Sequence, residues 1–230
     1  MWRNLLNRVI VPLLFVVAAV VISVRGMRYS VAYNENIKAL QDKETYVISP
    51  YDDMFRRVGA DYDVDWLLLS AIARAESEFR FDAISKAGAV GLMQIMPVTA
   101  KSMGYEREQL FEAEVSAVIA AQLLHENNNM LRLASDFDST ERLRFILACY
   151  NAGYSRVADA RRLARYHREN ADCWSVVAKY LALMSDKEYY EHEVVRSGEF
   201  VGSEETIAYV SKVIHIYKVY KAIVSQFEER

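Results

Sequence analysis

Glu76 is the residue whose setting points most directly to chemistry. It lies near the end of an apolar segment, in Ala-Arg-Ala-Glu-Ser-Glu-Phe, four residues after Ile72 and so on the same flank of an expected helix. A carboxyl group held against apolar surface is penalised when ionised, so its pKa rises toward the range for proton donation at neutral pH. On position alone the plainer interpretation is the stronger one, because a glutamate near a helix end is usually a solvated surface residue. Glu78, two residues on, points elsewhere and is the natural control.

Four short blocks follow one another along the chain: Glu76-Ser-Glu-Phe79 with Ser85, Gly88-Ala-Val-Gly91-Leu-Met-Gln-Ile-Met-Pro97, Ala148-Cys-Tyr-Asn-Ala-Gly153, and Glu205-Thr-Ile-Ala-Tyr-Val210. Their order and spacing closely resemble the motifs of the soluble lytic transglycosylase (SLT) domain family. The resemblance runs from about Asp65 to Val219, some two-thirds of the chain. One short block would be weak support, whereas four in order are strong support.

The resemblance implies a lysozyme-like helical fold and cleavage of the β-1,4 bond between N-acetylmuramic acid and N-acetylglucosamine in peptidoglycan glycan strands. In this family the C6 hydroxyl of the muramic acid closes on C1, which leaves a 1,6-anhydro end. One carboxyl group suffices, because it protonates the departing oxygen and then takes the proton of the C6 hydroxyl. The neighbouring acetamido oxygen is thought to stabilise the oxocarbenium-like centre, so no second carboxylate is required.

The resemblance also assigns roles to residues. Glu76 becomes the acid/base, and Gly88 and Gly91 let their loop approach the sugar closely without a Cβ. The substrate-binding residues implied are Ser85, Gln94, Met96, Tyr150, Asn151, Glu205 and Tyr209.

Several of these assignments have plainer alternatives. Gln94 could instead satisfy the backbone of its loop, and Met96 could be a core filler. Tyr150 could be a core aromatic residue on a helical stripe. Glu205 could be a first-turn residue that favours the helix dipole.

Two rival functions stay open. A goose-type lysozyme shares the helical fold but delivers water with the help of a positioned aspartate, for which Asp82 is a candidate. A catalytically silent, membrane-tethered glycan-binding module is the other rival. The retained acid argues against it.

Some positions depart from the family pattern. Ser116, Ala117 and Ala120 replace the usual Asn-Ile and glycine, which weakens the helix contacts expected there. Cys149 stands where alanine is usual. We expect the long insertion from Arg161 to Tyr190 to shape one end of the groove.

The elements that position these residues are all expected to be helices. Apolar residues recur three or four apart in several stretches, such as Leu68, Ile72, Ala75 and Phe79, and no stretch shows a sustained period of two. The fold class predicted is therefore all-α. Asp65 is the expected N-cap of a helix reaching about Phe79, Arg80 to Pro97 an expected loop, and Lys187 to Ser203 another loop before the last helix.

The N-terminus predicts contact with a membrane. Val9 to Val24 is an apolar run with arginines on both flanks. We expect residues 1–28 to be a transmembrane anchor, with a cleaved signal segment or a buried helix as alternatives. Residues 29–50 are then a juxtamembrane spacer and residues 51–230 the catalytic domain. Because the substrate lies outside the cytoplasmic membrane, we expect the domain in the periplasm, anchored to that membrane or secreted there.

Composition excludes other classes of partner. The 230 residues carry a net charge of −3, which lacks the basic surplus of proteins that bind nucleic acid. Cys149 and Cys173 show no metal-ligand spacing, so we expect neither metal nor cofactor. Their pairing stays open, and two buried free thiols are favoured.

Overall fold

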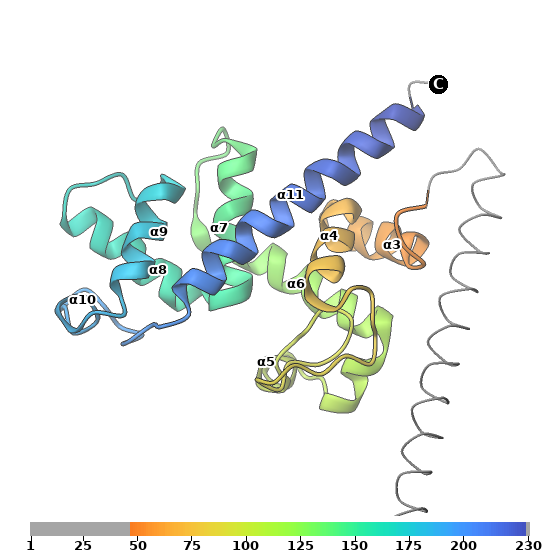
Figure 1. Ribbon diagram of the computed structural model, residues 1–230, viewed down its shortest axis with the longest axis horizontal. Coiled ribbons are helices and arrows are strands. Elements are labelled where there is room, and N and C mark those ends of the chain that lie inside the picture. The colour runs from red at the N-terminus through yellow and green to blue at the C-terminus, as the bar shows by residue number, and fades with distance from the viewer. Residues whose placement is uncertain (1–46, 229–230) are drawn as a thin grey trace, which may run out of the picture. The chain divides into compact units, whose positions relative to one another are not determined.

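The structure, a computed structural model, describes residues 47–228. In this range the chain is helical and forms no strand, although isolated antiparallel bridges join Val90 to Ile84 and to Ile95. The all-α prediction is thereby confirmed for the described residues. The helices (Figure 1) are α3 (Asp52–Tyr62), α4 (Trp66–Ser77), α5 (Pro97–Ser102), the 3₁₀ helix η2 (Arg107–Phe111), α6 (Ala113–Leu131), α7 (Ser139–Ala152), α8 (Tyr154–Tyr166), α9 (Trp174–Leu183), α10 (Lys187–Tyr190) and α11 (Ser203–Glu228).

The start of the folded unit is fastened to its first helix. The Ser49 side chain is buried and donates a hydrogen bond to Asp52 at 2.7 Å, and the backbone N–H groups of Ile48 and Ser49 donate to the same carboxylate. The predicted membrane segment (1–28) and residues 29–46 of the predicted spacer lie outside the described residues. Within residues 47–228, no helix combines the length and apolar composition that crossing a bilayer requires.

Helix α4 brings Glu76 to the edge of the core. Asp65 caps its first turn, because the side chain accepts a hydrogen bond from the backbone N–H of Leu67 at 2.9 Å. The helix ends at Ser77, two residues before the predicted end. Glu78 and Phe79 both adopt positive φ angles, 54° and 65°, and left-handed residues cannot continue an α-helix. Glu76 therefore sits in the last turn.

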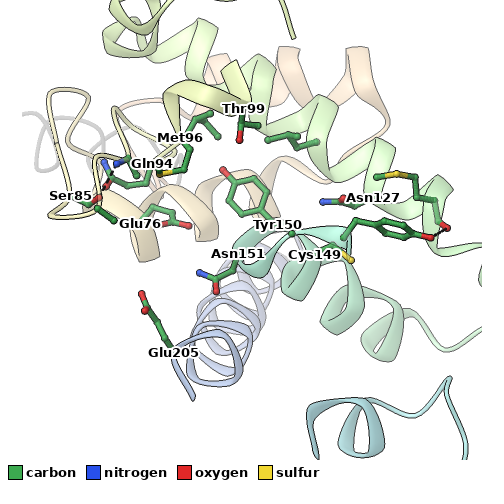
Figure 2. A pocket seen from close by; sticks show the side chains of 17 residues that line it. Glu76, Ser85, Gln94, Met96, Thr99, Asn127, Cys149, Tyr150, Asn151 and Glu205 are labelled. Carbon is green, nitrogen blue, oxygen red and sulfur yellow. Dashed lines mark hydrogen bonds between the residues drawn. The ribbon is translucent and has the colours of Figure 1, made fainter. Parts of the chain in front are cut away.

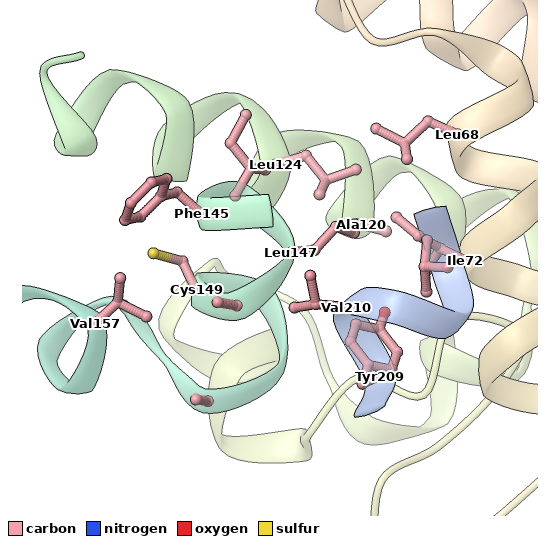
Figure 3. Close-up of a cluster of buried hydrophobic side chains, with 14 of the residues drawn as sticks. Leu68, Ile72, Ala120, Leu124, Phe145, Leu147, Cys149, Val157, Tyr209 and Val210 are labelled. Atoms are coloured by element: carbon pink, nitrogen blue, oxygen red, sulfur yellow. The ribbon is translucent and has the colours of Figure 1, made fainter. Parts of the chain in front are cut away.

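Helix α7 is the centre around which the core packs (Figure 3). Every residue from Phe145 to Cys149 is buried, so this stretch has no face toward solvent. Helices α6, α8, α9 and α11 all contact it, and α11 also packs along α4. Helix α11 thus covers one side of both α4, the helix of Glu76, and the central helix α7.

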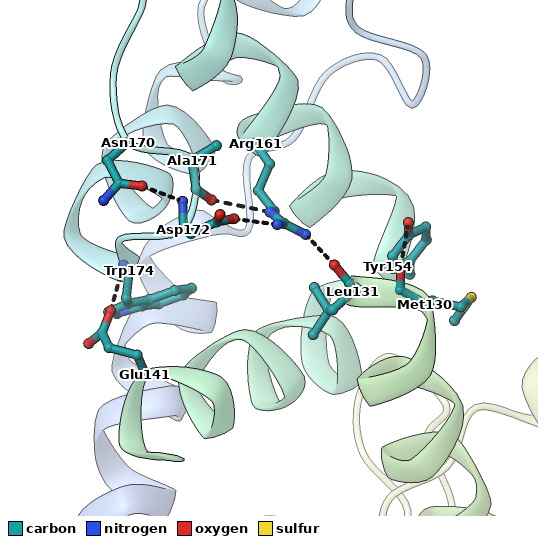
Figure 4. A network of polar contacts seen from close by, with 9 residues as sticks. All are labelled: Met130, Leu131, Glu141, Tyr154, Arg161, Asn170, Ala171, Asp172 and Trp174. Atoms are coloured by element: carbon teal, nitrogen blue, oxygen red, sulfur yellow. Dashed lines mark hydrogen bonds and ion pairs between the residues drawn. The ribbon is translucent and has the colours of Figure 1, made fainter. Parts of the chain in front are cut away.

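The insertion from Arg161 to Tyr190 builds a separate corner of the fold, with α9 packed on α8. Its centre is the buried Arg161, which donates hydrogen bonds to the carbonyl oxygens of Leu131 (2.8 Å) and Ala171 (3.1 Å) and pairs with Asp172 (Figure 4). A buried guanidinium is tolerated because each edge finds an acceptor. This side chain ties the end of α6 to α8.

The two cysteines are free thiols. Cys149 is buried on α7, and burial raises the pKa of its thiol to about 12, so it stays protonated. Cys173 is only half-buried, at the start of α9.

Gly91 serves internal packing and not approach to a ligand, which corrects its expected role. A Cβ at this position would lie 1.9 Å from the carbonyl oxygen of Leu110, so the missing side chain lets the loop press against η2. Gly88 also has a positive φ, but a Cβ there would meet nothing within 4 Å. The space that a side chain of residue 91 would need is filled by Leu110, whereas the space beside Gly88 is open.

We expect Gly91→Ala to destabilise the domain by about 3 kcal/mol or more, because overpacking against backbone adds to the cost of a positive φ. Gly88→Ala, which meets only the backbone cost, should lose about 1 kcal/mol. Urea unfolding of both variants measures the difference. Equal losses would show that the contact with Leu110 does not constrain the loop.

Candidate active site

A cavity of about 450 Å³ opens beside the end of α4, in the size range of small-ligand sites (Figure 2). Seven of the eight predicted site residues line it: Glu76, Ser85, Gln94, Met96, Tyr150, Asn151 and Glu205. They come from α4, the following loop, α7 and α11. Residues more than a hundred positions apart in sequence therefore meet around one space.

The Glu76 carboxyl group is poised between its two protonation states at neutral pH. Burial raises its pKa from 4.5 to about 7, which is the largest effect. Tyr209 and the Lys212 ammonium lower the pKa, and the Glu205 carboxylate raises it. A group with this pKa can both donate and accept a proton at pH 7. Glu78, by contrast, is exposed and does not line the cavity.

Lys212 of α11 also fixes the end of α4, the helix that carries Glu76. Its Nζ donates a hydrogen bond to the carbonyl oxygen of Ala75 at 2.7 Å, one residue before Glu76. A cation at a helix C-terminus satisfies a carbonyl without an intrahelical partner and favours the helix dipole. The same side chain therefore positions the acid's backbone and influences its charge.

Three hydroxyl groups clamp the backbone that carries Gln94. Ser77 of α4 donates to the Leu92 carbonyl oxygen at 2.8 Å, and Tyr150 of α7 donates to that of Met93 at 2.8 Å. Ser116 of α6 accepts from the Met93 N–H at 3.1 Å. Ser116 had been expected to weaken contacts of its helix, but it braces the loop. This hydroxyl clamp leaves the loop little freedom to move relative to Glu76.

Gln94 combines the two roles considered for it. It lines the cavity, and its backbone has a positive φ of 48°. Its side-chain nitrogen donates to the carbonyl oxygens of Ala83 (3.1 Å) and Gly91 (3.0 Å), as the structural alternative predicted. Ser85 has a similar local bond, accepting from the Ala89 N–H at 3.0 Å. Both side chains are thereby held in place at the cavity wall.

The opposite wall comes from the junction of α7 and α11. The side-chain amide oxygen of Asn151 (Oδ1) accepts a hydrogen bond from the Thr206 hydroxyl at 2.7 Å. Glu205, the residue before Thr206, is exposed and faces the cavity. Met96 lies on the loop side and is 40% exposed, which argues against the core-filler alternative for it.

Tyr209 does not line the cavity, unlike the other predicted residues. It is only 8% exposed and belongs to the core beside Glu76. Its hydroxyl is near enough to lower the pKa of Glu76, yet it makes no hydrogen bond of good geometry within the described residues. Burial and the Glu76 charge raise the pKa of both the Tyr209 and Tyr150 phenols, so both stay protonated.

The cavity also has lining residues that the motifs did not indicate. These include Leu123, Asn127 and Met130 of α6, together with Thr99 and Tyr154. The three α6 residues are spaced four and three apart, a helical signal that the sequence contains but that reads as ordinary core packing. No residue of the 161–190 insertion lines this cavity, so the expectation that it shapes one end is wrong for the groove described here.

Several known proteins are similar to this chain in fold or in sequence. The fold is shared with the 70 kDa soluble lytic transglycosylase SLT70 of Escherichia coli, at a TM-score of 0.53 and 24% identity over 76% of this chain and 24% of that chain. Membrane-bound lytic murein transglycosylase F of Marinobacter nauticus is 31% identical over 169 residues, which are 74% of this chain and 32% of the relative. Its namesake from Yersinia pseudotuberculosis is 36% identical over 145 residues, 63% of this chain and 28% of the relative.

Residues 53–172, just over half of the chain, match the family model described as the transglycosylase SLT domain. The chain belongs to this family, which confirms the resemblance seen in the motifs. It spans about a third of the length of the curated relatives it matches.

The raised pKa of Glu76 has a measurable effect on stability. Between pH 4.5 and 7 the folded state holds a proton that the unfolded state has lost, so the free energy of unfolding falls as pH rises. We expect Glu76→Gln, which cannot ionise, to gain up to about 3 kcal/mol over the parent between pH 4 and pH 8.

Urea unfolding of parent and variant across this pH range measures the gain, with Glu78→Gln as the control that should track the parent. A Glu76→Gln advantage that stays constant with pH would contradict the raised pKa.

Proposed function

We propose that this chain is a lytic transglycosylase that cleaves peptidoglycan glycan strands between N-acetylmuramic acid and N-acetylglucosamine. The observation that carries the proposal is a single carboxyl group of pKa about 7, Glu76, at a cavity walled by amide, hydroxyl and aromatic side chains. Such side chains bind sugars through hydrogen bonds and ring contacts. Family membership and the names of the curated relatives support the same activity.

The reaction needs one group that acts twice. Protonated Glu76 gives its proton to the glycosidic oxygen as the bond from that oxygen to C1 of the muramic acid breaks. The resulting carboxylate takes the proton of the C6 hydroxyl as this oxygen bonds to C1, which closes the 1,6-anhydro ring. The proton removed equals the proton donated, so the acid is regenerated in each cycle. A pKa near neutrality keeps both steps accessible.

The other residues at the cavity position the strand. We assign Ser85, Gln94 and Met96 to the loop side, and Tyr150, Asn151 and Glu205 to the opposite side. Tyr209 we assign to support of the Glu76 carboxyl group from the core, since it lies outside the cavity lining. This differs from the substrate-binding role that the resemblance implied for Tyr209.

The site argues against hydrolysis of the goose-lysozyme kind through Asp82. Asp82 is exposed and does not line the cavity. The second carboxylate at the cavity is Glu205, which is exposed on α11. If Glu205 activated water, the products would carry a reducing end. Mass spectrometry of digested peptidoglycan separates the two reactions, because anhydro products are lighter by one water.

We expect Glu76→Gln to lose about 100-fold or more of the cleavage rate on sacculi while folding and glycan binding persist, because the amide keeps the shape but cannot donate a proton. Glu78→Gln should cleave at nearly the parent rate. Release of soluble muropeptides measures both. Activity of Glu76→Gln above about a tenth of the parent rate, or equal losses in the two variants, would show that another group is the acid.

For the whole chain we propose a domain held outside the cytoplasmic membrane, in the periplasm. Residues 1–28 would serve as a membrane anchor or a cleaved signal segment, residues 29–50 as a spacer and residues 51–230 as the catalytic domain. The apolar run from Val9 to Val24 and the names of the curated relatives, which are membrane-bound, support this layout. Sequencing the N-terminus of protein purified from native membranes decides between anchor and cleaved segment.

A further inference from the structure

Asn127 of α6 has a setting that neither packing nor the proposed acid chemistry explains. Its residue surface is only 5% exposed, and its side chain makes no hydrogen bond within the described residues. The side-chain polar atoms sealed from solvent without a partner belong to Ser70, Arg156 and Tyr209. The Asn127 amide is not among these, so it keeps access to the cavity that it lines.

The direction of the Asn127 side chain also indicates that its amide faces the cavity. Figure 2 shows the Asn127 amide pointing toward Tyr150, with Tyr150 lying between Asn127 and Glu76 in this view. The next two residues of the same run behave differently. Asn128 accepts a hydrogen bond from Arg142 at 3.0 Å, and Asn129 is exposed. Of the three consecutive asparagines, only Asn127 presents its amide to the cavity.

The surroundings of the amide are apolar and uncharged. Leu123 and Met130 flank it on α6, and the protonated Cys149 thiol and the Tyr154 ring come from the other side of the cavity. The Tyr154 hydroxyl is occupied, since it donates to the Met130 carbonyl oxygen at 3.1 Å. The charged side chains that line the cavity are Glu76 and Glu205, on α4 and α11. This end of the cavity therefore offers one amide in apolar surroundings.

We propose that Asn127 forms a specificity subsite for the 2-acetamido group of a neutral N-acetylhexosamine, on the other side of Tyr150 from the acid. This inference rests on the proposed glycan substrate. The side-chain N–H of Asn127 donates a hydrogen bond to the acetamido oxygen, and the side-chain oxygen of Asn127 accepts one from the acetamido N–H. The apolar neighbours contact the acetamido methyl group. The described residues that line the cavity include no cation, which disfavours the lactyl carboxylate of muramic acid at this position.

Binding of two neutral tetrasaccharides tests the subsite. Chitotetraose carries an acetamido group on each sugar, whereas cellotetraose has the same β-1,4 chain with hydroxyl groups instead. Calorimetry on the full chain carrying Glu76→Gln measures affinity without turnover. Adding Asn127→Leu should weaken chitotetraose about 5- to 30-fold, the contribution of one or two neutral hydrogen bonds. Cellotetraose affinity should change less than about threefold.

The matched control is Asn129→Ala in the same Glu76→Gln background, which should leave both affinities unchanged. Leucine has the same γ-branched arrangement of side-chain heavy atoms as asparagine but is larger and cannot form hydrogen bonds. If Asn127→Leu unfolds below the assay temperature, Asn127→Ala carries the same expectation. An unchanged chitotetraose affinity, or equal losses for both sugars, overturns the subsite while leaving the proposed function intact. If the Glu76→Gln chain binds neither sugar, the glycan proposal and the subsite fail together.

Discussion

The hydroxyl clamp formed by Ser77, Ser116 and Tyr150 is the constraint on which the site depends. It connects three helices to two consecutive residues of one loop, Leu92 and Met93. Without the clamp, the loop would be held mainly by local hydrogen bonds within its turns. Gln94 is the residue directly after Met93, so the clamp also fixes its position. Because the clamp comes from the helix of the acid, the central helix and α6, the cavity wall cannot shift without disturbing the core. The precision of the site is therefore a property of core packing.

The Glu76 carboxyl group depends on the packing of the helices as well. Its proton affinity is set first by burial and only then by Tyr209, Lys212 and Glu205. All three of these belong to α11, whereas the acid belongs to α4. A neutral-range pKa thus results from two helices meeting, and neither helix alone would produce it.

Much of the fold and of the candidate site could be predicted from the sequence. The features that could not be predicted depend on tertiary contacts. Apolar spacing predicted helices because burial on one face leaves a periodic trace. Motif residues predicted most of the cavity wall. The partner of Gly91 could not be predicted, since Leu110 reaches it only through tertiary packing. The setting of Asn127 could not be predicted either, because a polar residue on an apolar stripe reveals its role only when the space beside it is known. The burial of Tyr209 beside Glu76 could not be predicted either, because a motif names a residue but does not show which part of its side chain the core covers.

The extent of α11 bears on how this domain should be delimited. The family match ends at residue 172, before α11 begins at Ser203. A fragment cut at that limit would retain Glu76, the glycine loop and the tyrosine motif, yet its acid would face water where α11 had been. Such a fragment would contain all residues of the first three motifs. Its Glu76, however, would have the ordinary pKa of a surface glutamate instead of a pKa near neutrality. The family match is thus narrower than the folded unit that sets the environment of Glu76.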